Sequence, residues 1–275
     1  MAHRPPNYPP GLHASSQRRL VLRDMLPPAI KNGTGRLLDW ILPPQCLACG
    51  ALNERSGALC TACWEKADFL ASPWCQCCGL PFELPMPSGA LCGACLRHAP
   101  AYDRARAVMA YGELSRRMIL GLKYGDRADM APAFADWLSR SGGELVADAD
   151  WITPVPLHWT RLFTRRFNQA ALLARLLSRD HARPFAPDML VRHKRTPTQA
   201  GLSPAKRRRN VQGVFALGPR WKQRVIDKRV LVIDDVYTTG ATVTACAKVL
   251  KRAGASAVDV LSVARVVRSL AAGQE

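Results

Sequence analysis

The fold is decided by residues 229–255, which read RVLVIDDVYTTGATVTACAKVLKRAGA. Residues 230–233 form an uninterrupted apolar run, which is typical of a parallel strand that is covered on both faces. The apolar residues of 242–252 recur at helical spacing, and Gly254 follows as a C-terminal cap. Strand, short polar loop and helix in direct succession indicate an α/β unit.

The loop between this strand and this helix carries the chemistry. Three hydroxyls and a run of backbone amides stand at the start of the helix, where the helix dipole favours a phosphate dianion. They belong to Thr238, Thr239, Gly240, Ala241 and Thr242. Asp234 and Asp235 end the strand and would repel a phosphate, so ribose hydroxyls are their natural partners. The segment predicts a ribose phosphate site outside the carboxyl end of a strand; a plain helix cap beside two solvated aspartates is the alternative.

Cysteines mark a second region of the chain. Nine of the ten fall within residues 46–95, and eight of them form Cys-x-x-Cys pairs: Cys46/Cys49, Cys60/Cys63, Cys75/Cys78 and Cys92/Cys95. Two intervening residues let a tight turn aim both sulfurs at one metal, and a second pair completes a tetrahedron around Zn²⁺. Four pairs predict two structural zinc sites, with sequential or interleaved pairing left open. The alternative, a disulfide framework, belongs to secreted chains.

Other segments alternate between strand and helix patterns. Strands are predicted at 106–111, 151–154, 230–233 and 257–263, and helices at 115–124, 128–139, 168–178 and 242–252. Alternation of this kind indicates an α/β fold with a doubly wound, mostly parallel sheet. We expect three regions: a disordered or weakly ordered tail at 1–40, a double zinc-ribbon domain at 41–100, and the α/β domain at 101–275.

The chain is strongly basic, with a formal net charge of +18. This charge favours phosphate-rich partners, whether nucleotide or nucleic acid. Residues 192–209 contain seven Lys or Arg and no acid, and their glycine and prolines predict a mobile loop. No apolar stretch is long enough for a membrane helix and no secretory signal is evident, so we expect a cytoplasmic protein without membrane insertion.

Residues 230–242 resemble the phosphoribosyl pyrophosphate signature of type I phosphoribosyltransferases, with Tyr237 where an aliphatic residue is commoner. Further segments extend the similarity: the Cys-x-x-Cys pairs, LKY at 122–124, PVPLH at 154–158, Arg161-Leu162, RFNQA at 166–170, and Gln199 through Asn210-Val211. Together they resemble the ComF family of bacterial proteins, over residues 46 to about 266.

This resemblance implies a type I phosphoribosyltransferase fold and a glycosyltransferase that acts on phosphoribosyl pyrophosphate with Mg²⁺. It also implies a link to natural competence and DNA uptake, but it does not supply the acceptor. The catalytic candidates are Asp234, Asp235 and Arg166. Further ligand-binding candidates are Lys123, Arg161 and Arg165, which suit the phosphates and the departing diphosphate, and Gln199, Arg207 and Asn210 on a closing loop. A solvated basic turn and a surface lysine are the alternatives for these cations.

A second hypothesis comes from another class of function. In it the chain is a non-catalytic, nucleotide-gated protein whose zinc domain and basic loop hold single-stranded DNA, with other competence proteins as partners. A DNA role predicts affinity that falls steeply with ionic strength.

Overall fold

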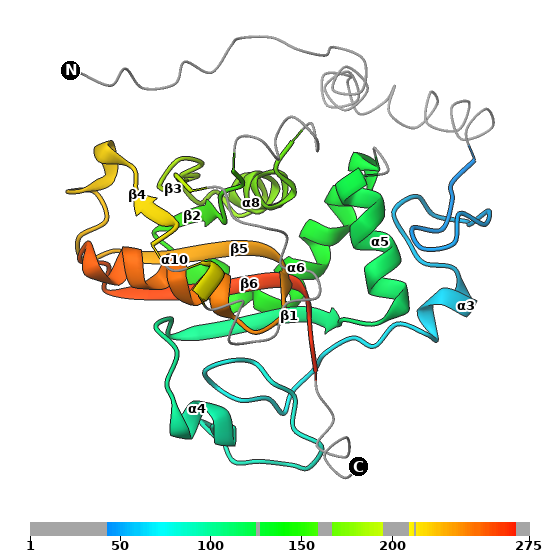
Figure 1. Ribbon diagram of the computed structural model, residues 1–275. Coiled ribbons are helices and arrows are strands. Elements are labelled where there is room, and N and C mark those ends of the chain that lie inside the picture. Colours follow the sequence, from blue (N-terminus) through cyan, green and yellow to red (C-terminus); the bar gives the residue numbers. More distant parts are fainter. Residues whose placement is uncertain (1–42, 125–126, 159–166, 195–208, 212, 268–275) are drawn as a thin grey trace, which may run out of the picture.

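The computed structural model describes residues 43–124, 127–158, 167–194, 209–211 and 213–267. A parallel sheet forms its centre (Figure 1). Within the described residues this sheet has four strands in the order β1-β6-β5-β2, and every pairing between them is parallel. Their bounds are β1 Arg104–Ala110, β6 Ala257–Arg265, β5 Arg229–Tyr237 and β2 Trp151–Pro154. The parallel α/β fold predicted from the alternation of strands and helices is confirmed.

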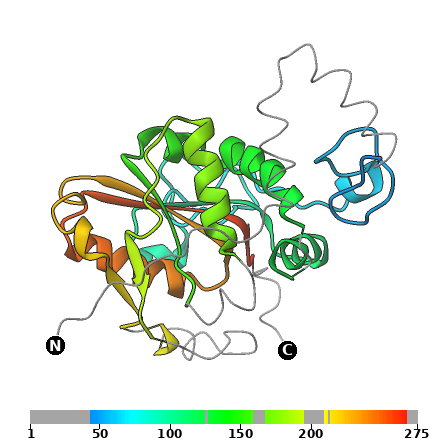
Figure 2. The same cartoon turned by 90° about the horizontal axis from the view of Figure 1, so that it is seen from above.

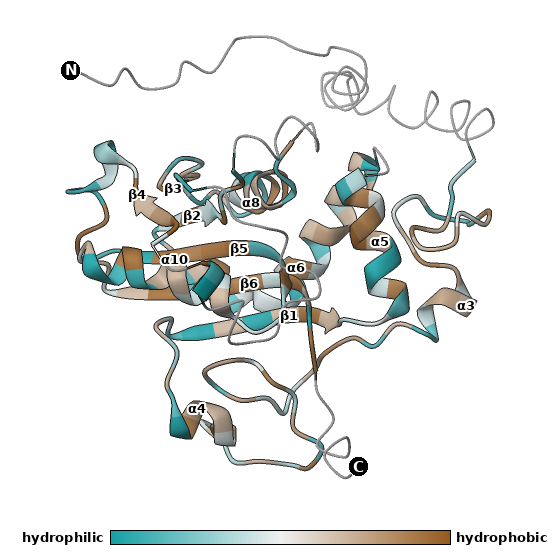
Figure 3. Cartoon of the chain, in the orientation of Figure 1, coloured by the Kyte–Doolittle hydropathy of each residue, from teal (hydrophilic) through white to brown (hydrophobic). Residues whose placement is uncertain are grey.

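Helices cover both faces of the sheet. Their bounds are α5 Glu113–Tyr124, α6 Ala131–Asp148, α8 Gln169–Asp180 and α10 Ala241–Arg252. One core cluster joins α5, α6 and α8 to Leu231 and Ile233 of β5, whereas the other joins α10 to Val230 and Val232 of the same strand. Because successive strand residues point to opposite faces, the apolar run of β5 serves both cores. Figure 3 shows this run as largely hydrophobic.

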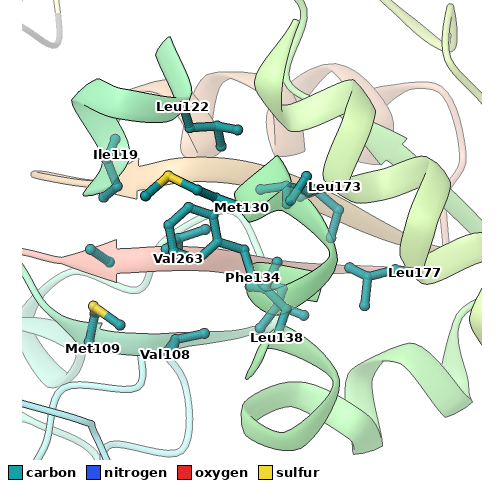
Figure 4. Packing of buried hydrophobic residues seen from close by; sticks show 14 of the residues in the cluster. Val108, Met109, Ile119, Leu122, Met130, Phe134, Leu138, Leu173, Leu177 and Val263 are labelled. Atoms are coloured by element: carbon teal, nitrogen blue, oxygen red, sulfur yellow. The ribbon is translucent and has the colours of Figure 1, made fainter. Parts of the chain in front are cut away.

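The core on the α5, α6 and α8 face is packed tightly. In Figure 4 Met130, Phe134 and Leu138 pack beside the strands, with Leu173 and Leu177 of α8 next to them. These side chains are fully or almost fully buried. Burial of this kind stabilises a fold by about 1.5 to 3 kcal/mol for each large apolar side chain, so this face anchors the sheet.

Helix α6 is longer than its sequence predicts. The prediction ended at Ser139, but the helix continues to Asp148, and a 3-10 turn at Ala128–Met130 precedes it. Gly142 has non-helical dihedral angles inside α6, and a side chain there would overlap Leu261 of β6. Gly142 thus permits close contact between helix and sheet.

A short hairpin lies beside the main sheet. It pairs β3 Leu190–Arg192 with β4 Phe215–Leu217 in antiparallel fashion, and β4 contacts α10. Neither strand was predicted, because three residues are too few to give a clear alternating pattern, and Arg192 was predicted to belong to the basic loop. Residues 195–208 of that loop lie outside the described residues.

The cysteine-rich region forms two small units, here called the first ribbon (residues 43–67) and the second ribbon (residues 72–98). Each contains one short helix, α3 Thr61–Trp64 in the first and α4 Gly93–Arg97 in the second. The first ribbon, drawn in blue, lies beside α5 in both views, whereas the second lies along β1 (Figures 1 and 2).

The segment between the ribbons extends the edge of the sheet. The Leu70 amide donates to the Val108 carbonyl at 2.9 Å, and the Ala110 amide donates to the Asp68 carbonyl at 2.8 Å. The chain therefore crosses from one ribbon to the other along the outer edge of β1. Among the described residues, no helix has both the length and the apolar character needed to span a bilayer.

Candidate functional site

The first ribbon brings four cysteine sulfurs together. Cys46, Cys49, Cys60 and Cys63 place their sulfur atoms within 4.8 Å of one another, and the Cys49 and Cys60 sulfurs are 3.7 Å apart. Four sulfurs at the usual Zn–S distance of about 2.3 Å would be about 3.8 Å apart in a tetrahedron. The Cys60 amide also donates to the Cys46 sulfur at 3.3 Å, which stabilises thiolate charge. The four thiol groups fit a structural Zn²⁺ ion.

The second ribbon repeats this arrangement. The sulfurs of Cys75, Cys78, Cys92 and Cys95 form the other such cluster found among the described residues. The Cys78 and Cys92 sulfurs are 3.7 Å apart, and the Cys92 amide donates to the Cys75 sulfur at 3.2 Å. Pairing is thus sequential, which the sequence had left open. Cys77 and His98 stay outside both clusters.

The predicted phosphate loop lies at the carboxyl edge of the sheet. Strand β5 does not end at Ile233 as predicted but continues to Tyr237, because β6 is equally long and pairs Asp234 with Ser262 and Tyr237 with Arg265. The two aspartates therefore lie within the strand rather than at its end. Thr238 to Gly240 then form the turn into α10, which begins at Ala241.

Gly240 is the N-cap of α10 and determines the shape of this turn. Its φ is 72°, in the left-handed region that favours glycine. A side chain at this position would also overlap the Tyr237 hydroxyl. The glycine of the motif is therefore required both by its backbone conformation and by the tyrosine packed against it.

A small cavity opens at the turn. Its lining includes Asp234, Tyr237 and the loop residues Thr238, Gly240, Ala241 and Thr242. Backbone amides and threonine hydroxyls at a helix N-terminus suit a small anion such as phosphate. The buried Thr239 hydroxyl oxygen has no hydrogen-bond partner within the described structure. A buried hydroxyl without a partner is costly, but Thr239 is not among the residues that line the cavity.

The acidic pair has an unusual electrostatic balance. Burial, followed by the adjacent Asp235 carboxylate, raises the pKa of Asp234 from 3.8 to about 8. Asp234 accepts a hydrogen bond from the Asp235 amide at 2.9 Å, and Asp235 forms an ion pair with Lys123 of α5. Perturbed carboxyl pairs of this kind are frequent at functional sites, and a ligand cation or hydroxyl donors would favour the ionised form.

Some of the predicted site residues lie close together in the structure, and others lie outside the described residues. The structure brings Lys123 to the acidic pair, although as a partner of Asp235, and it gathers the Thr238 to Thr242 segment at one helix N-terminus. The predicted arginines lie outside the described residues: Arg161, Arg165, Arg166 and Arg207. Val155 and Asn168 lie on either side of the segment that carries the first three of these arginines. The Asn168 side-chain amide donates a hydrogen bond to the Val155 carbonyl at 3.0 Å.

Two residues near the loop were missed from the sequence. The Tyr102 hydroxyl lies 2.6 Å from the Tyr237 hydroxyl, and the Arg265 guanidinium lies over the Tyr237 ring at 5.0 Å from its centroid. Burial raises the pKa of Tyr237 to about 12, so its hydroxyl keeps its proton near neutral pH. Tyr102 and Arg265 carry no local signal, although Tyr237 itself stands where an aliphatic residue is commoner in the motif.

Comparison with known proteins identifies the family. Residues 37–96 match the model of the double zinc ribbon domain. Over 235 residues the chain is 31% identical to Competence protein F of Haemophilus influenzae, a match that covers 80% of this chain and 96% of that protein. The chain belongs to the ComF family. Within it, DNA utilization protein YhgH of Escherichia coli K12 is 32% identical, with 76% of this chain and 91% of that protein covered.

Solved structures give a more distant likeness to this ComF family chain. Orotate phosphoribosyltransferase from Aeropyrum pernix is 19% identical, and the match covers 56% of this chain and 78% of that chain with a TM-score of 0.33.

Proposed function

We propose that the chain binds phosphoribosyl pyrophosphate together with Mg²⁺ and transfers the phosphoribosyl group to an acceptor. One observation carries this proposal. At the carboxyl edge of a parallel sheet, the turn into α10 presents a helix N-terminus, and a cavity there is lined by Thr238, Gly240, Ala241 and Thr242 together with Asp234, which precedes Asp235 on the strand. That combination suits a phosphate joined to a ribose better than phosphate alone, because the acids would repel an isolated anion.

Each described residue has a role in this proposal. The backbone amides and hydroxyls of the loop would hold the 5-phosphate, with Gly240 allowing the tight turn. Asp234 and Asp235 would accept hydrogen bonds from the ribose hydroxyls and orient the sugar. Lys123 would keep Asp235 in place and add positive charge near the ligand phosphates.

In the reaction the bond between ribose C1 and the diphosphate oxygen breaks, and a bond from C1 to the acceptor nucleophile forms. The acceptor loses a proton, and Asp235 is the carboxylate we propose as its recipient. Mg²⁺ bound with the ligand would supply charge neutralisation for the departing diphosphate. Arg161, Arg165, Arg166 and Arg207 are proposed to add to that neutralisation.

Both carboxylates fit a ligand that carries a divalent cation. The raised pKa of Asp234 reflects burial beside a second acid, and a nearby cation would relieve both effects. The names of the relatives, a competence protein and a DNA utilization protein, support a place for this chemistry in DNA uptake.

Calorimetric titration of phosphoribosyl pyrophosphate with Mg²⁺ tests the proposal. The zinc-loaded wild type should bind, and the Asp234→Asn, Asp235→Asn double variant should bind at least about tenfold more weakly. Asp136→Asn, at an exposed position on α6, is the matched control and should bind like the wild type. Failure of a folded wild type to bind would overturn the proposal and favour nucleic-acid binding, which titration with single-stranded DNA at two salt concentrations would then detect.

A further inference from the structure

The second ribbon contacts the sheet through three consecutive carbonyl groups. The carbonyls of Gln76 and Cys77 accept hydrogen bonds from β1, the first from the Arg106 guanidinium at 3.2 Å and the second from the Ala105 amide at 2.6 Å. The Cys78 carbonyl accepts one from the Arg265 guanidinium at the end of β6. Because Cys75 and Cys78 belong to the second cluster, the metal-binding turn itself forms this contact.

Arg265 continues the connection to the phosphate loop. It is buried, and its guanidinium lies over the ring of Tyr237, which is its register partner across β5 and β6. The next amide in the chain, that of Val266, donates to the Tyr237 carbonyl at 2.9 Å. The last residue of β5 before the loop is therefore held from two sides by the end of β6.

A second connection comes from Tyr102, just before β1. It is 3% exposed and packs in the same core cluster as Cys75, Cys78, Cys92 and Cys95. Its ring meets that of Tyr237 edge to face with centroids 6.3 Å apart, and the two hydroxyls are hydrogen-bonded at 2.6 Å. Removal of one hydroxyl leaves the other poorly satisfied in a buried place, which carries a free-energy cost.

The Tyr237 hydroxyl in turn lies against Gly240, where any side chain would overlap it. Gly240 is the N-cap of α10, and Tyr237 lines the cavity beside it, so the tyrosine packs directly against the turn that leads into the helix. The first ribbon contrasts with this arrangement. Its cysteines Cys46 and Cys63 pack in the other core cluster with α5 and α6, on the opposite face of the sheet.

We propose that Tyr102 and Tyr237 are positioning residues through which the second ribbon, and not the first, holds the phosphate loop in its binding conformation. The inference rests on the proposed function, because it deepens the account of the same loop. It assigns the second zinc cluster a role in ligand affinity in addition to its structural role.

The test uses ribose 5-phosphate as the probe, titrated by calorimetry into the zinc-loaded full chain. Tyr102→Phe and Tyr237→Phe should each weaken binding by about five- to tenfold, and the double variant should lose no more than either single variant. Tyr111→Phe, at an exposed tyrosine after β1, is the matched control and should bind like the wild type. Because both buried variants keep their rings, circular dichroism and zinc content should stay unchanged.

A second experiment compares the two zinc clusters by replacing the last cysteine of each, which lies on α4 in the second ribbon and on α3 in the first. Cys95→Ser should weaken ribose 5-phosphate binding by about as much as the tyrosine variants, whereas Cys63→Ser should stay within about twofold of the wild type. If either cysteine variant fails to fold, the tyrosine variants decide the matter alone.

The outcomes separate the two claims. A wild type that does not bind ribose 5-phosphate overturns the proposed function and the inference with it. A wild type that binds, with both tyrosine variants binding equally well, overturns the inference and leaves the proposed function standing. Additive losses in the double variant would also contradict a shared hydrogen bond between the two tyrosines.

Discussion

The two zinc ribbons have the same ligands and the same local hydrogen bonds, yet they serve opposite faces of the sheet. The first joins the core beneath α5 and α6, while the second joins the core beneath α10. Even the glycine after each first pair differs, since Gly50 faces open space and Gly79 lies against the Ala105 carbonyl. The same metal-binding turn therefore packs with helices α5 and α6 in one place and against strand β1 in another.

Loss of zinc is the largest change that tests this comparison. Each cluster supplies core residues to one face, so stripping both ions should disturb both faces. Structural Zn²⁺ binds isolated finger peptides with about 10 to 16 kcal/mol, and we expect the Tm to fall by more than about 10 °C. Elemental analysis should give two zinc ions per chain before chelation, and hydrogen exchange should show residues 43–98 opening first. An unchanged Tm after complete zinc removal would contradict this account.

Replacement of the paired glycines gives an intermediate effect. Gly50 and Gly79 both have positive φ, at 78° and 68°, so alanine at either position should cost about 1 to 2 kcal/mol of backbone strain. Gly79→Ala also forces the ribbon away from β1, and we expect a total of about 3 kcal/mol or more. Chemical denaturation of the two variants measures the difference, with Gly50→Ala as the control. Equal losses would show that the second ribbon is not held closely against the sheet.

The smallest expected effect concerns Asp234 in the candidate site, at the carboxyl edge of the sheet. Because the pKa of Asp234 is raised to about 8, its ionised form is disfavoured in the folded chain. The free energy of unfolding should therefore fall as pH rises from about 4 to 8. Asp234→Asn keeps the acceptor for the Asp235 amide and removes this penalty. The variant should be about 1 kcal/mol more stable above pH 8, since water screens the partly exposed carboxyl, and equal to the wild type near pH 4.

Denaturation curves at pH 4.5 and pH 8.5 would check this last prediction. A stabilisation that is the same at both values would indicate a packing effect instead of a charge effect. A destabilised variant at high pH would mean that the ionised carboxylate has favourable partners in the unliganded chain.

The regular part of the fold could be predicted because its signals are local. The apolar run of β5, the helical spacing of α10 and the glycine between them lie within one short segment, and the structure places all three as expected. The cysteine spacing likewise predicted two four-sulfur clusters. The predicted ends of strands and helices were wrong where a neighbouring element sets them. Strand β5 continues to Tyr237 because it pairs with β6. Helix α6 continues through Gly142 because the glycine lets the helix contact Leu261.

The contacts that hold the candidate loop from the side of the second ribbon could not be predicted from local sequence. Tyr102 and Tyr237 are 135 positions apart, and nothing near Tyr102 distinguishes it from an ordinary core tyrosine. Contact between Arg265 and the Cys78 carbonyl depends on how the second ribbon packs against the sheet. Such long-range pairs follow from tertiary packing, whereas the residues that would touch a ligand gather in one motif.

The most direct test of the central claim is a crystal structure of the zinc-loaded chain with phosphoribosyl pyrophosphate and Mg²⁺. The account predicts the 5-phosphate at the backbone amides of residues 239–242, the ribose hydroxyls at Asp234 and Asp235, and unchanged contact between Tyr102 and Tyr237. A ligand bound elsewhere on the chain, with this loop left empty, would contradict it.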